Sequence, residues 1–252
     1  MSDFDRNYAA RSRGLGADRA VAIDQGLRAY MIRVYNYMAA GLALTGVVAW
    51  LTFNAAVTET GGRLALTEFG RTLYSTPVAI VLFLGTLGLV FAISFMIQRL
   101  QPATAFALFM VYAGALGLML SSVFLTYTET SVTRVFFISA AAFGALSMYG
   151  YTTRRDLTPI GSFLVMGLIG LIIAMLVNMF LKSTGVEFII SAAGVLIFAG
   201  LTAWDTQKIK EMYDPREDGT LVGRKAVMGA LTLYLDFINL FMFLLRFLGD
   251  RR

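Results

Sequence analysis

Long apolar runs separated by short polar breaks cover nearly the whole chain. Each run is about as long as the roughly 20 residues that an α-helix needs to cross a hydrocarbon core about 30 Å thick. The pattern therefore predicts an all-α membrane protein with seven transmembrane helices. We expect them near Tyr30–Ala56, Pro77–Ile97, Thr104–Leu125, Val132–Thr152, Ile160–Leu181, Phe188–Asp205 and Val227–Phe247.

The connections between these runs set the expected organisation. Most are only a few residues long, so consecutive helices should be antiparallel neighbours. Two longer loops, Val57–Thr76 and Thr206–Ala226, carry most of the remaining charge. Residues 1–29 mix arginines with aspartates and contain no apolar stretch, which excludes a secretory signal peptide. We expect a polar cytoplasmic arm over 1–29, mobile or interfacial, one membrane domain over 30–249 and a short basic tail over 250–252.

Composition then narrows the chemistry. The 252 residues are 58% hydrophobic and 15% charged, and they include no cysteine and no histidine. Disulfides, thiol nucleophiles, Cys/His zinc sites and Ser-His-Asp triads are thereby excluded. We expect no enzyme and no cofactor. The net charge of +5 would suggest nucleic acid for a soluble protein, but in a membrane protein it indicates basic loops against anionic lipid, so the expected partner is the bilayer and not nucleic acid.

The distribution of Lys and Arg predicts a cytoplasmic N-terminus. With that orientation the cytoplasmic segments hold thirteen basic residues and the opposite side about seven, as the positive-inside rule requires. Seven spans would then leave the C-terminus outside. The tail is itself basic, with Arg246, Arg251 and Arg252, and argues the other way. Whether the last helix crosses fully is therefore open at this point.

Two aspartates lie within predicted spans, where an ionised side chain is costly and usually functional. Asp205 is near the cytoplasmic end of the sixth span and Asp236 is in the middle of the seventh, 31 residues further on. The midpoint between them, Thr220, falls next to the turn-forming stretch 214–219. An antiparallel hairpin would bring both carboxyls to similar depth if the sixth helix continued to about Tyr213.

Polar residues at helical spacing accompany the pair. On the last span Thr232, Asp236 and Asn239 share one face, and Thr202 lies one turn before Asp205 on the sixth. Such a seam should face protein or water and could form an ion path. The alternative is that each aspartate is a neutral, hydrogen-bonded packing residue.

Two neighbouring carboxyls in a low-dielectric site do not easily ionise together, so they are expected to share a proton and to titrate as a pair. Loss of that proton would make the helices repel and would leave an oxygen-rich site suited to transient binding of a hard cation such as Ca²⁺ by Asp205 and Asp236. Arg99, at the cytoplasmic end of the second span, is a candidate counter-charge. Its other interpretation is a solvated arginine at the end of a loop.

The residues around both aspartates resemble the two C-terminal signatures of the Bax inhibitor-1 family. They are Trp204-Asp205-Thr206-Gln207-Lys208-Ile209 and Leu233-Tyr234-Leu235-Asp236-Phe237-Ile238-Asn239-Leu240-Phe241, the latter followed by Leu244-Leu245-Arg246. The resemblance covers about residues 28–249. The absence of eukaryotic targeting features indicates a bacterial member in the inner membrane.

This resemblance implies a last helix at the centre, wrapped by the other six, and a pH-sensitive calcium leak gated by Asp205 and Asp236. The connection between the two aspartates departs from the family, because 213–219 makes it several residues longer than in compact members. The family's second-helix arginine, proposed to latch onto the aspartates, corresponds to Arg99 by position only, since no motif surrounds it.

Four other functions are alternatives to a cation leak, and the sequence argues against two of them. An intramembrane aspartyl protease also carries aspartates on its sixth and seventh helices, but its Gly-x-Gly-Asp signature is replaced here by Leu233-Tyr234-Leu235 before Asp236. A retinal protein needs a lysine in its last span, and none lies between Ala226 and Arg246. Two alternatives to a leak stay open: a non-conducting modulator that binds a membrane quality-control protease, and a proton-coupled cation exchanger.

Overall fold

The computed structural model describes residues 3–60 and 63–252, and their side chains over 23–59 and 64–252. Within these residues seven helices are long and apolar enough to cross a membrane, as the sequence predicts. The first span is the part of α1 from Ile23 on, and the third combines α4 with a short helix, α5 (Val123–Thr126). The long helices are α1 (Asp3–Ala56), α3 (Thr76–Met96), α4 (Pro102–Leu120), α6 (Glu129–Thr152), α7 (Thr158–Leu181), α8 (Thr184–Glu211) and α9 (Gly219–Leu248).

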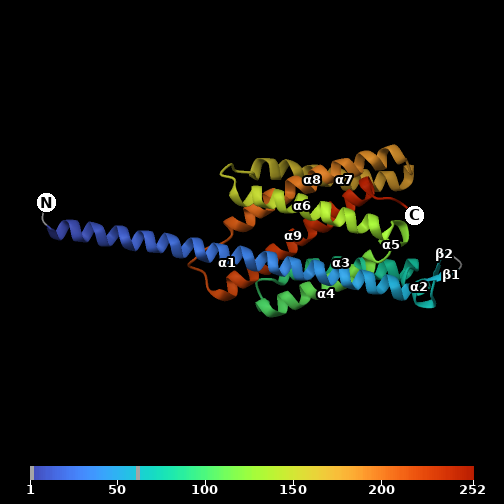
Figure 1. The fold of residues 1–252 in the computed structure, drawn as a ribbon, viewed down its shortest axis with the longest axis horizontal. Coiled ribbons are helices and arrows are strands. Elements are labelled where there is room, and N and C mark those ends of the chain that lie inside the picture. The colour runs from blue at the N-terminus through green and yellow to red at the C-terminus, as the bar shows by residue number, and fades with distance from the viewer. Residues whose placement is uncertain (1–2, 61–62) are drawn as a thin grey trace.

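Helix α9 is the centre of the bundle. In its most apolar stretch 67% of the residues are buried, against 11% in α3 and in α7. It packs mainly against α8, α1, α6 and α4, while α3 lies outside on α4 and α7 lies outside on α8 (Figure 1). Large exposed apolar side chains concentrate on α3 and α7, which is the composition of a lipid-facing surface. The last helix therefore fills the core, as expected from the family resemblance.

Close helix crossings depend on glycine. At Gly150 of α6 a Cβ atom would overlap the backbone carbonyl of Ala203 on α8, and at Gly194 of α8 it would overlap the ring of Phe243 on α9. Small residues let the backbones approach where no side chain could fit, which is the main source of van der Waals packing between helices in lipid. These crossings hold α8 tightly against both neighbours.

The longer loop after the first span is partly ordered, which its polarity did not predict. It contains a two-stranded antiparallel hairpin, β1 (Val57–Thr60) and β2 (Arg63–Leu66), and a short helix α2 (Glu68–Leu73). Thr67 begins α2 by accepting a hydrogen bond from the Gly70 backbone N–H at 3.0 Å, as serine and threonine do at helix N-caps.

The predicted polar arm is helical and continuous with the first span. Helix α1 begins at Asp3 and runs without a break to Ala56, and its N-terminal part extends away from the bundle (Figure 1). Residues 3–29 are thus helical, which the sequence did not indicate, and the expectation of a mobile or interfacial arm stays a prediction. A helix needs no apolar stripe where the chain stays polar all round, so hydropathy alone did not reveal it.

The last helix runs the full length of the bundle. Its tail lies at the end opposite the α3–α4, α6–α7 and α8–α9 connections (Figure 1), where Arg251 pairs with Tyr127 in an isolated β-bridge. The tail's charges have partners there: Arg251 to Glu187 at 2.8 Å, Arg252 to Glu129 at 3.7 Å and Asp250 to Arg134 at 2.8 Å. The basic tail is therefore compatible with seven complete crossings, because acidic side chains offset its arginines.

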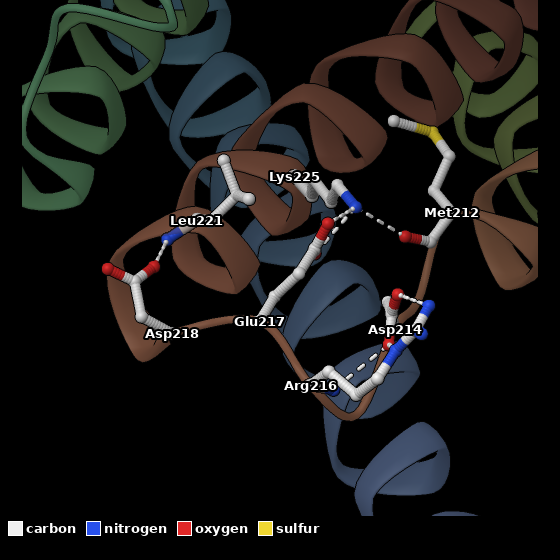
Figure 2. A network of polar contacts seen from close by, with 7 residues as sticks. All are labelled: Met212, Asp214, Arg216, Glu217, Asp218, Leu221 and Lys225. Carbon is white, nitrogen blue, oxygen red and sulfur yellow. Dashed lines mark hydrogen bonds and ion pairs between the residues drawn. The ribbon is translucent and has the colours of Figure 1, made fainter.

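The connection between α8 and α9 is a compact, hydrogen-bonded turn (Figure 2). Helix α8 continues to Glu211, close to the extension that the hairpin required. Lys225 of α9 donates to the Met212 carbonyl at 2.8 Å and to both carboxylate oxygens of Glu217. Asp218 caps α9 by accepting from the Leu221 N–H at 2.7 Å. These contacts fix the register of α9 against α8 despite the extra residues.

The α6–α8 crossing yields a stability prediction. We expect Gly150→Ala to lower the free energy of unfolding by about 1–3 kcal/mol, because the added methyl overlaps the Ala203 carbonyl and the helices must move apart. The matched control is Gly170→Ala, whose Cβ meets nothing within 4 Å and which should gain up to about 1 kcal/mol of helix propensity. Thermal unfolding in detergent measures both; equal midpoints would contradict this role of the crossing.

The α8–α9 connection yields a second stability prediction. Both members of the Lys225–Glu217 pair are about one-fifth exposed, at 23% and 20%, so Glu217→Gln leaves a half-buried ammonium without its counter-charge. We expect a loss of about 1 kcal/mol of unfolding free energy. Asp214→Asn, which breaks the exposed pair with Arg216 in the same turn, should leave the unfolding midpoint nearly unchanged. A larger effect of Asp214→Asn than of Glu217→Gln would refute the assignment.

Candidate functional site

Asp205 of α8 and Asp236 of α9 meet at the interface of the two helices. Each carboxyl lies within interaction range of the other, and the residues are only 8% and 5% exposed. The hairpin and its turn place them at the same depth. They are far enough from the helix ends that their own backbones cannot satisfy them, so the carboxyls depend on each other and on nearby side chains.

Little positive charge compensates this pair. Lys208 is the one cation recorded beside it among the described residues: its Nζ lies 3.9 Å from Asp205 Oδ1, one turn further along α8. The same ammonium is 57% exposed and lies over the Trp204 ring at 4.9 Å. Asp236 Oδ2 is buried and has no hydrogen-bond partner in the described part of the chain. Two negative charges here would be poorly compensated, and a proton shared between the carboxyls would remove one of them.

Arg99 lies just after α3, where the sequence placed it, and no ion pair with either aspartate is recorded for it among the described residues. It is exposed in the connection between α3 and α4, where the neighbouring Leu100 carbonyl accepts a hydrogen bond from Arg224 Nε at 2.6 Å. The charged group that the structure sets beside the aspartates is Lys208. Its position three residues after Asp205 was visible in the sequence.

The polar seam is present, but its members are largely satisfied by their own helices. Thr202 is fully buried and donates to the Phe198 carbonyl at 2.7 Å. Asn239 donates to the Leu235 carbonyl at 2.8 Å, and Thr232 is half-buried on α9. Both recorded bonds use a proton of the side chain, so Thr202 and Asn239 keep oxygen lone pairs that can accept a hydrogen bond or face a cation.

The residues that follow Asp205 fix α8 to α6 and to the α6–α7 connection, and through α6 to α1. Thr206 shares a 2.9 Å hydrogen bond with Ser147 of α6, which shares a 2.6 Å bond with Tyr35 of α1. Gln207 holds the α6–α7 connection, accepting from the Leu157 N–H and donating to the Arg155 carbonyl, both at 2.8 Å. The Asp-Thr-Gln signature thus has one carboxyl for the pair and two side chains that position it.

Tyr234 performs a similar task on α9. It is completely buried and shares a 2.6 Å hydrogen bond with the Thr45 hydroxyl, which also bonds the Ala113 carbonyl at 2.9 Å. Its ring packs edge-on against Phe109. Sequence reasoning missed Tyr35, Ser147, Thr206, Gln207 and Tyr234. The signal that could have found them is the same for all: a polar group in an apolar run needs a partner on another helix.

The described side chains contain no group of three or more acidic, histidine or cysteine ligands. Two carboxylates alone supply too few oxygens for the six to eight that Ca²⁺ prefers. The arrangement suits brief contact with a hydrated cation rather than a resident metal ion.

Comparison with known proteins gives consistent relatives. The family model described as inhibitor of apoptosis-promoting Bax1 matches residues 27–252. An uncharacterized protein of Rickettsia prowazekii is 51% identical over 91% of this chain and 92% of its own. One of Caulobacter vibrioides is 44% identical over the full length of both, and the Escherichia coli inner membrane protein YbhL is 44% identical over 94% of this chain and 97% of its own. Because the family model covers residues 27–252, which include both aspartates, and these relatives are at least 44% identical over nine-tenths or more of the chain, the chain belongs to the Bax inhibitor-1 family.

Proposed function

We propose that this protein is a pH-sensitive cation leak of the bacterial inner membrane, with Ca²⁺ as the permeant ion and the Asp205–Asp236 pair as the gate. The inner membrane is supported by the likeness to the Escherichia coli protein YbhL, whose name places that protein there. The observation that carries the proposal is the pair itself: two buried carboxyls on adjacent helices, beside which the described residues place one largely exposed ammonium, that of Lys208.

Protonation provides the switch. With one shared proton the pair carries one charge and a hydrogen bond that holds α8 to α9. Without it, two carboxylates repel in a medium that screens them weakly, and separation of the helices relieves that repulsion. The path opens along α9 and exposes oxygen ligands. Flux should therefore rise with pH as the pair loses its proton.

Ca²⁺ is the ion that the family resemblance implies, and the ligand chemistry is compatible with it. The chain offers no nitrogen or sulfur ligands of the histidine or cysteine kind, and the seam of Thr202, Thr232 and Asn239 adds further oxygens near the pair. Hard cations prefer such an all-oxygen path.

Two acidic groups outside the membrane, Asp214 and Asp156, do not supply this pH dependence. The Arg216 side chain and backbone N–H lower the pKa of Asp214 to about 2, and the Thr158 hydroxyl and N–H lower the pKa of Asp156. A depressed pKa means that the ionised, paired form is lost only as the pH falls below about 4. Both groups therefore stay ionised throughout the neutral range.

The same carboxyls also suit a second candidate, a proton-coupled exchanger, because a group that alternates between a proton and a cation can couple their movements. An imposed pH gradient separates the two: uphill Ca²⁺ transport indicates exchange, and strictly downhill flux indicates a leak. A non-conducting modulator of a membrane protease would give no flux above that of protein-free vesicles.

The leak proposal predicts the behaviour of two variants. In dye-loaded proteoliposomes between about pH 6 and 8, Ca²⁺ entry through the wild type should rise by up to about tenfold per pH unit, the limit for release of one proton. Asp205→Asn and Asp236→Asn should each abolish this dependence, because an amide neither ionises nor repels the remaining carboxyl. Asp156→Asn is the control and should keep the wild-type profile. Unchanged pH dependence in both pair variants would eliminate the gate.

We also propose that the N-terminus and the α8–α9 connection face the cytoplasm. Most cations outside the tail lie at that end, including Arg154, Arg155 and Lys225, whereas the tail arginines are ion-paired at the other. Positive residues are retained on the cytoplasmic side.

The absence of cysteine makes this orientation directly testable. In spheroplasts, a membrane-impermeant maleimide should label Arg71→Cys in α2 and leave Arg216→Cys in the α8–α9 connection unlabelled until the membrane is permeabilised. Both wild-type side chains are exposed, so folding should not limit access. The reverse labelling pattern would place the N-terminus outside.

A further inference from the structure

An open cleft separates α1 and α6 in the halves that lie toward the α6–α7 connection, the side proposed above to be cytoplasmic. Its volume is about 560 Å³, and every residue that lines it belongs to one of these two helices. We call it the α1–α6 cleft. A cavity of this size is within the range that holds small-molecule ligands. It is separate from the aspartate pair, neither member of which lines it.

The walls of the cleft are apolar and face the surface that meets lipid. Ile32 of α1 and Met148 of α6 line it and are 49% and 69% exposed. Gly144 lies between them on the wall, and a Cβ built there would meet nothing within 4 Å. The two helices thus diverge without side chains to fill the space, at a depth where hydrocarbon surrounds the protein.

One end of the cleft is cationic. Arg28 lines it where α1 leaves the bundle, and no ion pair is recorded for its exposed side chain among the described residues. Tyr151 lines the same end. Lys210 is held there, because its Nζ donates to the Tyr151 carbonyl at 2.8 Å and lies 5.6 Å from the ring centroid.

The floor is closed by hydroxyls. Tyr35 and Ser147 both line the cleft and join each other across it at 2.6 Å. Thr206 donates to the Thr202 carbonyl at 2.7 Å, so its bond to Ser147 uses the serine proton and Ser147 in turn accepts from Tyr35. Each hydroxyl donates its single proton within the protein in this way. A ligand in the cleft therefore need not accept a hydrogen bond from the floor.

We propose that the α1–α6 cleft binds one anionic phospholipid from the cytoplasmic-side leaflet, with an acyl chain against Ile32, Gly144 and Met148 and the phosphate at Arg28 and Lys210. An apolar slot that opens sideways into hydrocarbon and ends in cations at the membrane surface matches the division of a phospholipid into chain and charged headgroup. Basic groups between helices on the cytoplasmic side are suited to anionic headgroups.

Charge complementarity selects this occupant over others. A free anion would satisfy Arg28 but leave the apolar walls empty. A second copy of the chain or a partner helix would fill the walls, whereas a phospholipid supplies in one molecule both an acyl chain for the walls and an anion for Arg28 and Lys210. The site requires neither ion conduction nor the gate, so it stands independently of the proposed leak.

Native mass spectrometry of the full chain in mild detergent tests the proposal. After incubation with equal amounts of phosphatidylglycerol and phosphatidylcholine, the wild type should retain one lipid with a preference of about fivefold for phosphatidylglycerol. Arg28→Gln should reduce that preference to near unity. Gly144→Leu fills the slot and should reduce retention of both lipids several-fold.

Matched variants keep the test specific. Arg99→Gln removes another exposed cation of the same end, and Gly170→Leu adds the same side chain at a glycine of α7 that is equally open; both should retain lipid like the wild type. Unfolding midpoints for Gly144→Leu and Gly170→Leu that agree exclude misfolding as the cause.

Several outcomes would overturn the proposal. Undiminished retention in Gly144→Leu would show that lipid does not occupy the cleft. An unchanged preference in Arg28→Gln would remove the headgroup assignment. Displacement of phosphatidylglycerol by millimolar inorganic phosphate would reveal a free-anion site, and a dimer that Gly144→Leu converts to monomer would make a second copy the occupant.

Discussion

The structure depends on the burial of two carboxyls at the contact between its two most buried helices. Water cannot solvate these carboxyls inside the hydrocarbon, so the protein must hold them next to each other. Three features do this: the turn that sets the register of α9, the glycine crossings that hold α8 in place, and the hydroxyl contacts that begin at Thr206. A bundle of purely apolar helices would have no need of such exact positioning. Here misplacement by one turn would leave each carboxyl without its partner.

This constraint explains why α8 and α9 differ from the outer helices. On α3 and α7 any apolar side chain serves, because lipid accepts all of them equally. On α8, five successive residues, Trp204 to Lys208, have separate tasks: packing on α7, forming the pair, bonding α6, capping the α6–α7 connection and supplying the nearby ammonium. The two family signatures coincide with the places where side chains have individual partners.

The sequence predicted the spans and the meeting of Asp205 and Asp236 because both follow from one-dimensional rules: run length and spacing about a turn. It did not predict the partners of Thr206, Gln207 or Tyr234, because these depend on which helix lies opposite, a three-dimensional fact that periodicity does not carry. Arg99 was considered by analogy and proved to be exposed, whereas Lys208, one turn from Asp205, was overlooked. The helical arm and the β1–β2 hairpin were missed since neither has an apolar signature.

The central position of α9 has a consequence for biosynthesis. The element on which α1, α4, α6 and α8 pack is translated after the other six spans, so these spans enter the membrane before their core exists. Until α9 leaves the ribosome, the earlier spans can associate only loosely. During that time polar groups such as Thr45 and Asp205 lack their final partners on α9. The centre of the bundle is therefore added last, and a chain that stops before α9 has the surrounding helices without the helix on which they pack.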